Sequence, residues 1–120
     1  MKVYLAGGMK DDWRDKILNN VKYLKFLDPC SNGGGRMEEF WTWDIEAVKQ
    51  CDIIFCYYQK ENPGGESSIY EMAYGKALGK IVILIDEQQK RYWGPVRFMA
   101  DVCFDTLKEG IDYLKKYKGM

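Results

Sequence analysis

Two continuous apolar runs of strand length constrain the fold of this chain most strongly. They are Ile-Ile-Phe-Cys-Tyr-Tyr at 53–58 and Ile-Val-Ile-Leu-Ile at 81–85. Apolar runs without alternation are typical of central strands of a parallel sheet, which are covered on both faces. Residues 68–78 between them have helical spacing, with Gly79 as the expected stop. The pair therefore predicts a strand, a helix and a second strand.

The rest of the chain repeats this alternation. Strands are expected at 2–6, in a short run at 26–29 and at 102–104; helices are expected at 11–25, at 38–49 and in a last segment with Leu107, Ile111 and Leu114 on one face. Glycine-rich or polar loops at 28–35 and 59–65 separate them, and the first is a lid candidate. We expect one domain over 1–120, an α/β Rossmann-like or flavodoxin-like three-layer sandwich with a parallel sheet of about five strands.

Composition narrows the class of protein. Lysine plus arginine and aspartate plus glutamate both number 18, which disfavours a polynucleotide or a membrane as partner. No apolar run approaches a membrane span, and the start lacks a signal peptide, so we expect a cytoplasmic protein. The four cysteines lack CxxC spacing and are interpreted as free thiols. Histidine is absent, so no metal site is expected and catalysis has to depend on carboxylates, tyrosines, cysteines or lysines.

The order of elements also indicates where a ligand binds. In sheets of this kind ligands lie beyond the carboxyl ends of the strands, where the strand order reverses. This rule selects the segment from Tyr4 to Gly8, the loops 28–35 and 59–68, and the start of the helix that carries Glu71.

Three motifs together resemble the nucleoside 2-deoxyribosyltransferase family, which includes 2′-deoxynucleoside 5′-monophosphate N-hydrolases. They are Tyr-Leu-Ala-Gly-Gly at 4–8, the Asp44-(x)7-Asp52-Ile-Ile spacing, and the run from Glu66 to Lys80. The Trp13-Arg14 pair resembles a motif found in a branch of this family that is described only as deoxyribosyltransferase-like. The chain departs from the family at two positions: Ala73 replaces a glycine, and Gly65 stands where transferases often carry an aspartate that binds the base. The base and the acceptor therefore stay open.

The resemblance implies three catalytic residues. Glu71 would be the nucleophile that forms a deoxyribosyl-enzyme, Tyr4 would orient its carboxylate, and Asp44 would bind the sugar or assist protonation of the base. Each has a structural alternative: Ser68-x-x-Glu71 also reads as a capping box, Tyr4 as an ordinary strand aromatic, and Asp44 as a solvated helix carboxylate. Asp52 is interpreted as structural.

Six further residues are candidates for substrate binding: Gly7, Gly8, Gly65, Ser67, Ser68 and Asp101. The Gly-Gly-Glu-Ser-Ser stretch offers amides and hydroxyls at a helix start, which is a weak phosphate signal without a Walker lysine. The resemblance implies that Asp101 completes the site of a neighbouring subunit, which predicts a homodimer or higher homo-oligomer. The four tryptophans, at 13, 41, 43 and 93, are candidates for an interface or for base stacking, with core packing as the default.

We therefore predict an enzyme that cleaves or transfers the N-glycosidic bond of 2′-deoxynucleosides through a covalent deoxyribosyl-glutamate, without a cofactor. Its partner would be a small-molecule nucleoside or nucleotide. The alternatives are a 2′-deoxynucleoside 5′-monophosphate N-hydrolase and a non-catalytic nucleotide-binding module on the same fold. A flavodoxin-like electron carrier is disfavoured because the chain has no convincing phosphate loop for flavin.

Overall fold

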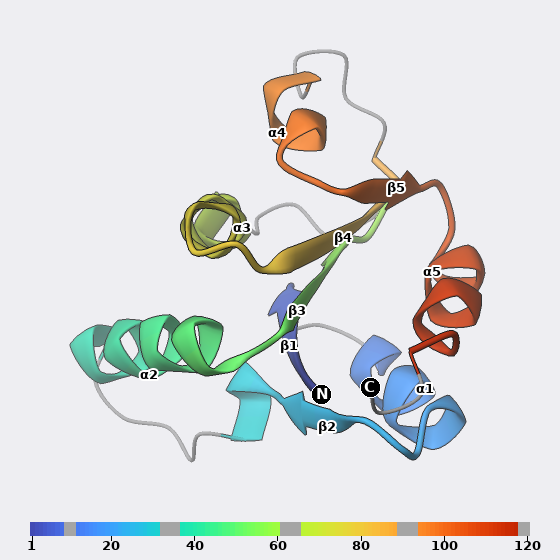
Figure 1. The fold of residues 1–120 in the computed structure, drawn as a ribbon, viewed down its shortest axis with the longest axis horizontal. Helices are drawn as coiled ribbons and strands as arrows, with labels where there is room; N and C mark the ends of the chain where they lie inside the picture. Colours follow the sequence, from blue (N-terminus) through green and yellow to red (C-terminus); the bar gives the residue numbers. More distant parts are fainter. Residues whose placement is uncertain (9–11, 32–36, 61–65, 89–93, 118–120) are drawn as a thin grey trace.

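A five-stranded parallel sheet forms the centre of the molecule (Figure 1). The computed structural model describes residues 1–8, 12–31, 37–60, 66–88 and 94–117. The strand order is β2-β1-β3-β4-β5, and every neighbouring pair is parallel. The strands are β1 (Lys2–Gly7), β2 (Lys25–Leu27), β3 (Ile53–Tyr58), β4 (Ile81–Asp86) and β5 (Val102–Phe104). This is the strand order of flavodoxin-like folds.

Helices cover both faces of the sheet. In Figure 1, α2 and α3 lie on one side and α1 and α5 on the other. The helices are α1 (Trp13–Asn20), α2 (Met37–Gln50), α3 (Glu66–Ala77), α4 (Gly94–Phe98) and α5 (Leu107–Leu114), with a short 3-10 turn η1 (Pro29–Ser31) after β2. The predicted three-layer α/β sandwich with five parallel strands is confirmed.

The strand alternation divides the core into two clusters. Leu5, Phe55 and Ile85 pack with the buried side chains of α1 and α5. Tyr4 and Ile54, their neighbours along the strands, pack with those of α2 and α3. Every residue of β3 is buried, as expected for the strand at the centre of the sheet.

Two helix boundaries differ from the sequence prediction. The helix expected over 11–25 ends at Asn20, because residues 25–27 pair with β1 as strand β2. Val21 and Leu24 lie between α1 and β2 and are buried in the core. Their apolar side chains continued the helical spacing in the sequence, so the helix was predicted to be too long. The helix expected over 68–78 begins earlier, at Glu66. Helix α4 was not predicted; it is short and has no buried residue to reveal it.

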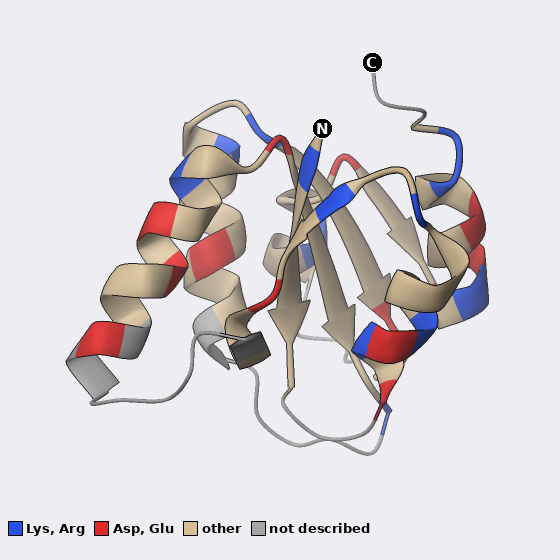
Figure 2. Ribbon diagram, turned by 90° about the horizontal axis from the view of Figure 1, so that it is seen from below, with Lys and Arg blue, Asp and Glu red and all other residues tan. Residues whose placement is uncertain are grey.

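Charges are distributed over the helices and the ends of the strands. Figure 2 shows lysine and arginine interspersed with aspartate and glutamate, while the middles of the strands carry almost no charge. The four cysteines are free thiols. Within the described part of the chain, no helix combines the length and apolar character needed to cross a membrane.

Candidate active site

The strand order reverses between β1 and β3, and the candidate site lies beside these two strands. β1 is followed along the chain by its outer neighbour β2, whereas the chain continues from β3 in the opposite direction to β4 and β5. The crossover helices α2 and α3 cover the same face of this junction. Such a switch point is the expected position of a ligand in an open α/β sheet.

Glu71 is a buried carboxylate on α3. The residue is 6% exposed, and none of the described residues forms a hydrogen bond with its Oε2 atom. Its pKa is raised to about 7: burial is the largest cause, the charge of Asp44 acts in the same direction, and the Tyr4 hydroxyl and the Arg14 guanidinium partly offset the rise. A carboxyl group that titrates near neutrality and has a free oxygen atom is suited to acid, base or nucleophilic chemistry.

Tyr4 lies on β1 and points toward the same place. The strand alternation sends Val3 and Leu5 to the α1 side and the Tyr4 ring to the α2 and α3 side. The ring is fully buried, and the hydroxyl has no hydrogen bond of ordinary geometry to any described residue. Burial first, and then the Glu71 carboxylate, raise the pKa of this hydroxyl, so it stays protonated and can act as a donor.

Asp44 brings a second carboxylate from α2. It is half-buried, and its Oδ1 atom is buried without a hydrogen-bond partner among the described residues. Burial raises its pKa, while Tyr4 and Arg14 act in the opposite direction. The structure thus brings together the three residues predicted to be catalytic, from three separate elements.

A pocket of about 320 Å³ opens onto the two carboxylates. It is lined by Trp41, Asp44, Ile45, Tyr70 and Glu71. Trp41 is 57% exposed and Tyr70 is 75% exposed, which is unusual for large aromatic side chains. The volume lies near the lower end of the range for small-molecule sites, and apolar walls with a few convergent polar groups are typical of them.

The capping-box interpretation of Glu71 is wrong. Because α3 begins at Glu66, Ser68 lies inside the first turn of the helix and is not its N-cap. Ser68 is instead buried, and its hydroxyl faces the Cys56 thiol on β3. Ser67 belongs to the first turn of α3, but its side chain is outside the described part of the structure, as is all of Gly65. Their roles in substrate binding stay predictions.

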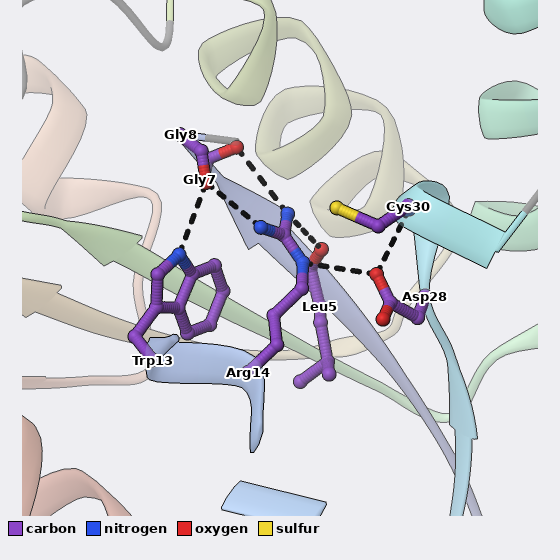
Figure 3. A network of polar contacts seen from close by, with 7 residues as sticks. All are labelled: Leu5, Gly7, Gly8, Trp13, Arg14, Asp28 and Cys30. Atoms are coloured by element: carbon purple, nitrogen blue, oxygen red, sulfur yellow. Dashed lines mark hydrogen bonds and ion pairs between the residues drawn. The ribbon is translucent and has the colours of Figure 1, made fainter. Parts of the chain in front are cut away.

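Gly7 and Gly8 lie at the carboxyl end of β1, where their carbonyl groups accept hydrogen bonds from side chains of α1 (Figure 3). The Gly8 carbonyl accepts hydrogen bonds from Trp13 Nε1 at 3.0 Å and from Arg14 Nη1 at 2.7 Å. Gly7 has φ +143°, and a Cβ atom there would lie 2.6 Å from the Tyr57 carbonyl oxygen. The turn therefore requires glycine at this position. Whether it contacts a substrate stays a prediction.

Asp101 lies apart from the other candidates within one chain. It directly precedes β5 and contacts the beginning of β4: its carboxylate accepts a hydrogen bond from the Val82 amide at 2.7 Å and pairs with Lys76 at 3.0 Å. Burial alone would raise its pKa, but these two contacts hold the pKa below its ordinary value. Asp52, interpreted as structural, accepts a hydrogen bond from the Lys2 amide at 2.8 Å.

Sequence reasoning gave no role to several residues of this site. Tyr70 and Ile45 were not singled out, although Trp41, Asp44 and Ile45 have the spacing of one helix face and Tyr70 directly precedes Glu71. Arg14 was noted only as part of the Trp13-Arg14 motif, and no contact was predicted for it. The described residues include no group of three or more side chains positioned to hold a metal ion.

No family model matches the sequence, and no curated protein matches it. The structure, however, is similar to solved structures. One is the 2-deoxyribosyltransferase of Bacillus psychrosaccharolyticus, with a TM-score of 0.76 and 18% identity over 99% of this chain and 93% of that one. A second is the CMP N-glycosidase BcmB of Clostridium botulinum, with a TM-score of 0.72 and 18% identity over 98% of this chain and 100% of that one.

A third similar structure is the 2-deoxyribosyltransferase of Leishmania mexicana, with a TM-score of 0.71 and 16% identity over 97% of both chains. The chain therefore has the fold of these deoxyribosyltransferase and N-glycosidase structures over nearly its whole length. The resemblance inferred from its motifs is confirmed at the level of the fold.

Proposed function

We propose that this protein cleaves or transfers the N-glycosidic bond of 2′-deoxynucleosides, with Glu71 as nucleophile. The observation that carries the proposal is that Asp44 and Glu71 line one pocket beside the switch point of the sheet, with the buried Tyr4 hydroxyl interacting with both carboxyl groups. The shared fold with deoxyribosyltransferases and an N-glycosidase supports the same reaction class. Nothing in the proposal requires a cofactor.

The reaction takes place in two displacements. In the first, the ionised Glu71 carboxylate attacks C1′, the C1′–N bond breaks, and its electron pair leaves with the base. The base nitrogen takes up a proton as the bond breaks; Asp44 lines the same pocket and is the proposed general acid, a role that a raised pKa favours. The product is a deoxyribosyl ester of Glu71.

In the second displacement, water or another base attacks C1′ from the opposite side. The ester C1′–O bond breaks, Glu71 is released as a carboxylate, and the proton of the attacking group returns to Asp44. The donor hydroxyl of Tyr4 can orient the carboxylate in both steps, because it is held in the core with no other hydrogen bond among the described residues. Trp41 and Tyr70 offer apolar walls for the base or the sugar.

A second candidate function is the N-hydrolysis of 2′-deoxynucleoside 5′-monophosphates. The specific observation in its favour is the similarity to a CMP N-glycosidase that is covered over its full length. A non-catalytic nucleotide-binding module on the same fold is the remaining alternative. This alternative does not explain why Glu71 is a buried carboxylate with a raised pKa and an oxygen atom without a hydrogen bond to the described residues. Burial of such a group costs free energy of folding.

The test is incubation of the purified protein with each deoxynucleoside and each 5′-monophosphate, followed by chromatography for free base. A parallel reaction with an added acceptor base separates transfer from hydrolysis. Intact mass spectrometry after rapid acid quenching should detect protein carrying one deoxyribosyl group, and the Glu71→Gln variant should carry none. Absence of base release from every substrate, together with tight binding of one of them, would favour the non-catalytic module.

A further inference from the structure

Arg14 is an arginine on α1 that is almost wholly withdrawn from solvent. It is 6% exposed, and its guanidinium donates to three carbonyl groups at the end of β1: Gly8 at 2.7 Å, Leu5 at 3.2 Å and Gly7 at 3.4 Å. Its Nε atom pairs with Asp28 Oδ1 at 3.0 Å (Figure 3). A planar fork of donors suits such a set of acceptors, and a lysine ammonium could not reproduce it.

These contacts connect three segments that meet at the site. Helix α1 packs on the face of the sheet opposite to Glu71, but the Arg14 side chain extends to the end of β1 and the segment after β2. Leu5, whose carbonyl it holds, directly follows Tyr4. Asp28 in turn accepts a hydrogen bond from the Cys30 amide at 2.9 Å. The hydrogen bond from Arg14 to the Leu5 carbonyl therefore also fixes the backbone of the adjacent Tyr4.

Arg14 also contributes charge to the site. The groups that face Glu71 are the Tyr4 hydroxyl from β1, the Asp44 carboxylate from α2 and the Cys56 thiol from β3. All of these are neutral or negative. The Arg14 guanidinium, although it is paired with Asp28, lowers the pKa of both carboxylates against the larger effect of burial.

We propose that Arg14 is a positioning residue of the active site, which fixes the carboxyl end of β1 and thereby holds the Tyr4 hydroxyl beside Glu71. The inference rests on the proposed function for its catalytic meaning. The physical claim, that Arg14 sets the surroundings of the Glu71 carboxylate by holding β1 in place, does not depend on any substrate. Its test can therefore succeed or fail independently of the reaction.

The experiment is a carboxyl ¹³C NMR titration of the whole protein labelled at glutamate side chains, with the Glu71 resonance assigned by its loss in Glu71→Gln. In Arg14→Gln we expect the Glu71 midpoint to move upward by on the order of half a pKa unit or more. Trp13→Phe is the matched control, because it removes the other side-chain donor to the Gly8 carbonyl without removing a charge. An unchanged midpoint in folded Arg14→Gln would overturn the proposal.

Arg14→Gln removes the ion-pair partner of the partly buried Asp28, and the variant can fail to fold for that reason. The comparison is then made in the Asp28→Asn background, where removal of Arg14 breaks no ion pair with residue 28. The double variant should have a higher Glu71 midpoint than Asp28→Asn alone; equal midpoints would overturn the proposal. If the protein releases base, kcat/KM at pH 6 should fall at least several-fold in the same variants. If it releases none, the proposed function fails and the titration still decides the role of Arg14.

Discussion

The Tyr4 hydroxyl and the Glu71 carboxylate share one buried site without a hydrogen bond of ordinary geometry between them. Burial is the largest influence on the pKa of each group; beyond it, Glu71 raises the pKa of Tyr4 and Tyr4 lowers that of Glu71. Two polar atoms left unsatisfied in a well-packed core cost free energy of folding. Such a cost is typical of a site that completes its contacts only with a ligand.

The first prediction concerns Glu71→Gln and the pH dependence of stability. The folded pKa of about 7 lies above the ordinary value of 4.5, so the folded state retains a proton that the unfolded state has lost. Wild-type stability should therefore fall as pH rises from 4.5 to 7, by roughly 3 kcal/mol at about 1.4 kcal/mol per pKa unit. Urea unfolding across this range should show that the variant lacks this decline and is the more stable protein above pH 7.

The control for this measurement is Glu46→Gln, which removes an exposed carboxylate from α2. Its stability curve should run parallel to that of the wild-type protein. Glu71→Gln should also abolish turnover while it preserves the fold. A folded Glu71→Gln protein with a near wild-type rate would eliminate the covalent mechanism.

The second prediction is an acid limb in the rate profile. A nucleophilic carboxylate has to be ionised, so kcat/KM should rise with pH through a midpoint near 7. Because Asp44 interacts with Glu71, the midpoint belongs to the pair of carboxylates. The measurement needs a deoxynucleoside whose base does not titrate between pH 5 and 9. A rate that has already reached its plateau at pH 5 would mean that the Glu71 carboxylate is ionised there, and would contradict the prediction.

The third prediction is that Tyr4→Phe separates activity from stability. The hydroxyl makes no hydrogen bond to the described residues, so its removal should change the free energy of unfolding by less than about 1 kcal/mol. Turnover should fall on the order of 10- to 100-fold, because the donor that orients Glu71 is lost. Tyr74→Phe, on the same helix as Glu71 and packed against the same core cluster, should leave the rate unchanged. Equal rates in all three proteins would assign Tyr4 to packing alone.

The sequence was sufficient to predict the layers of the fold, for physical reasons. The apolar runs at 53–58 and 81–85 have no polar face, so they fit only the centre of a sheet covered on both sides. Tyr4, Asp44 and Glu71, by contrast, were singled out through the resemblance of their motifs to a known family. The residues alone left a structural alternative open for each of them.

What the sequence could not predict depends on contacts between distant segments. The strand expected at 26–29 exists as β2, but the end of the preceding helix was misplaced, because Val21 and Leu24 are buried by tertiary packing after the helix has ended at Asn20. The pocket wall joins Trp41 on α2 to Tyr70 on α3, and their proximity follows from helix packing. Asp101 was placed by resemblance, whereas its pairing with Lys76 and Val82 is a tertiary contact.

The fourth prediction concerns the exposed aromatic wall of the pocket. Trp41→Ala and Tyr70→Ala should raise KM several-fold, because each removes apolar area that a base or sugar would cover. Both side chains are largely exposed in the free chain, so the free energy of unfolding should change by less than about 1 kcal/mol. Leu78→Ala, an exposed position at the end of α3 that does not line the pocket, is the control. Unchanged KM in both aromatic variants would place the substrate elsewhere.

The last prediction is that the working unit is a homo-oligomer, at least a dimer, in which the segment around Asp101 completes a neighbour's site. Within one chain Asp101 pairs with Lys76 and is not among the residues that line the pocket, so we expect it to contribute to catalysis through the site of a second copy. Phe98, close to Asp101 in sequence, is 85% exposed, and large exposed aromatics are enriched at subunit interfaces. Light scattering at micromolar concentration should therefore give a multiple of the 14.1 kDa chain mass, and Phe98→Asp should lower both the mass and the specific activity. A monomer whose specific activity is unchanged on dilution would show that each chain completes its own site.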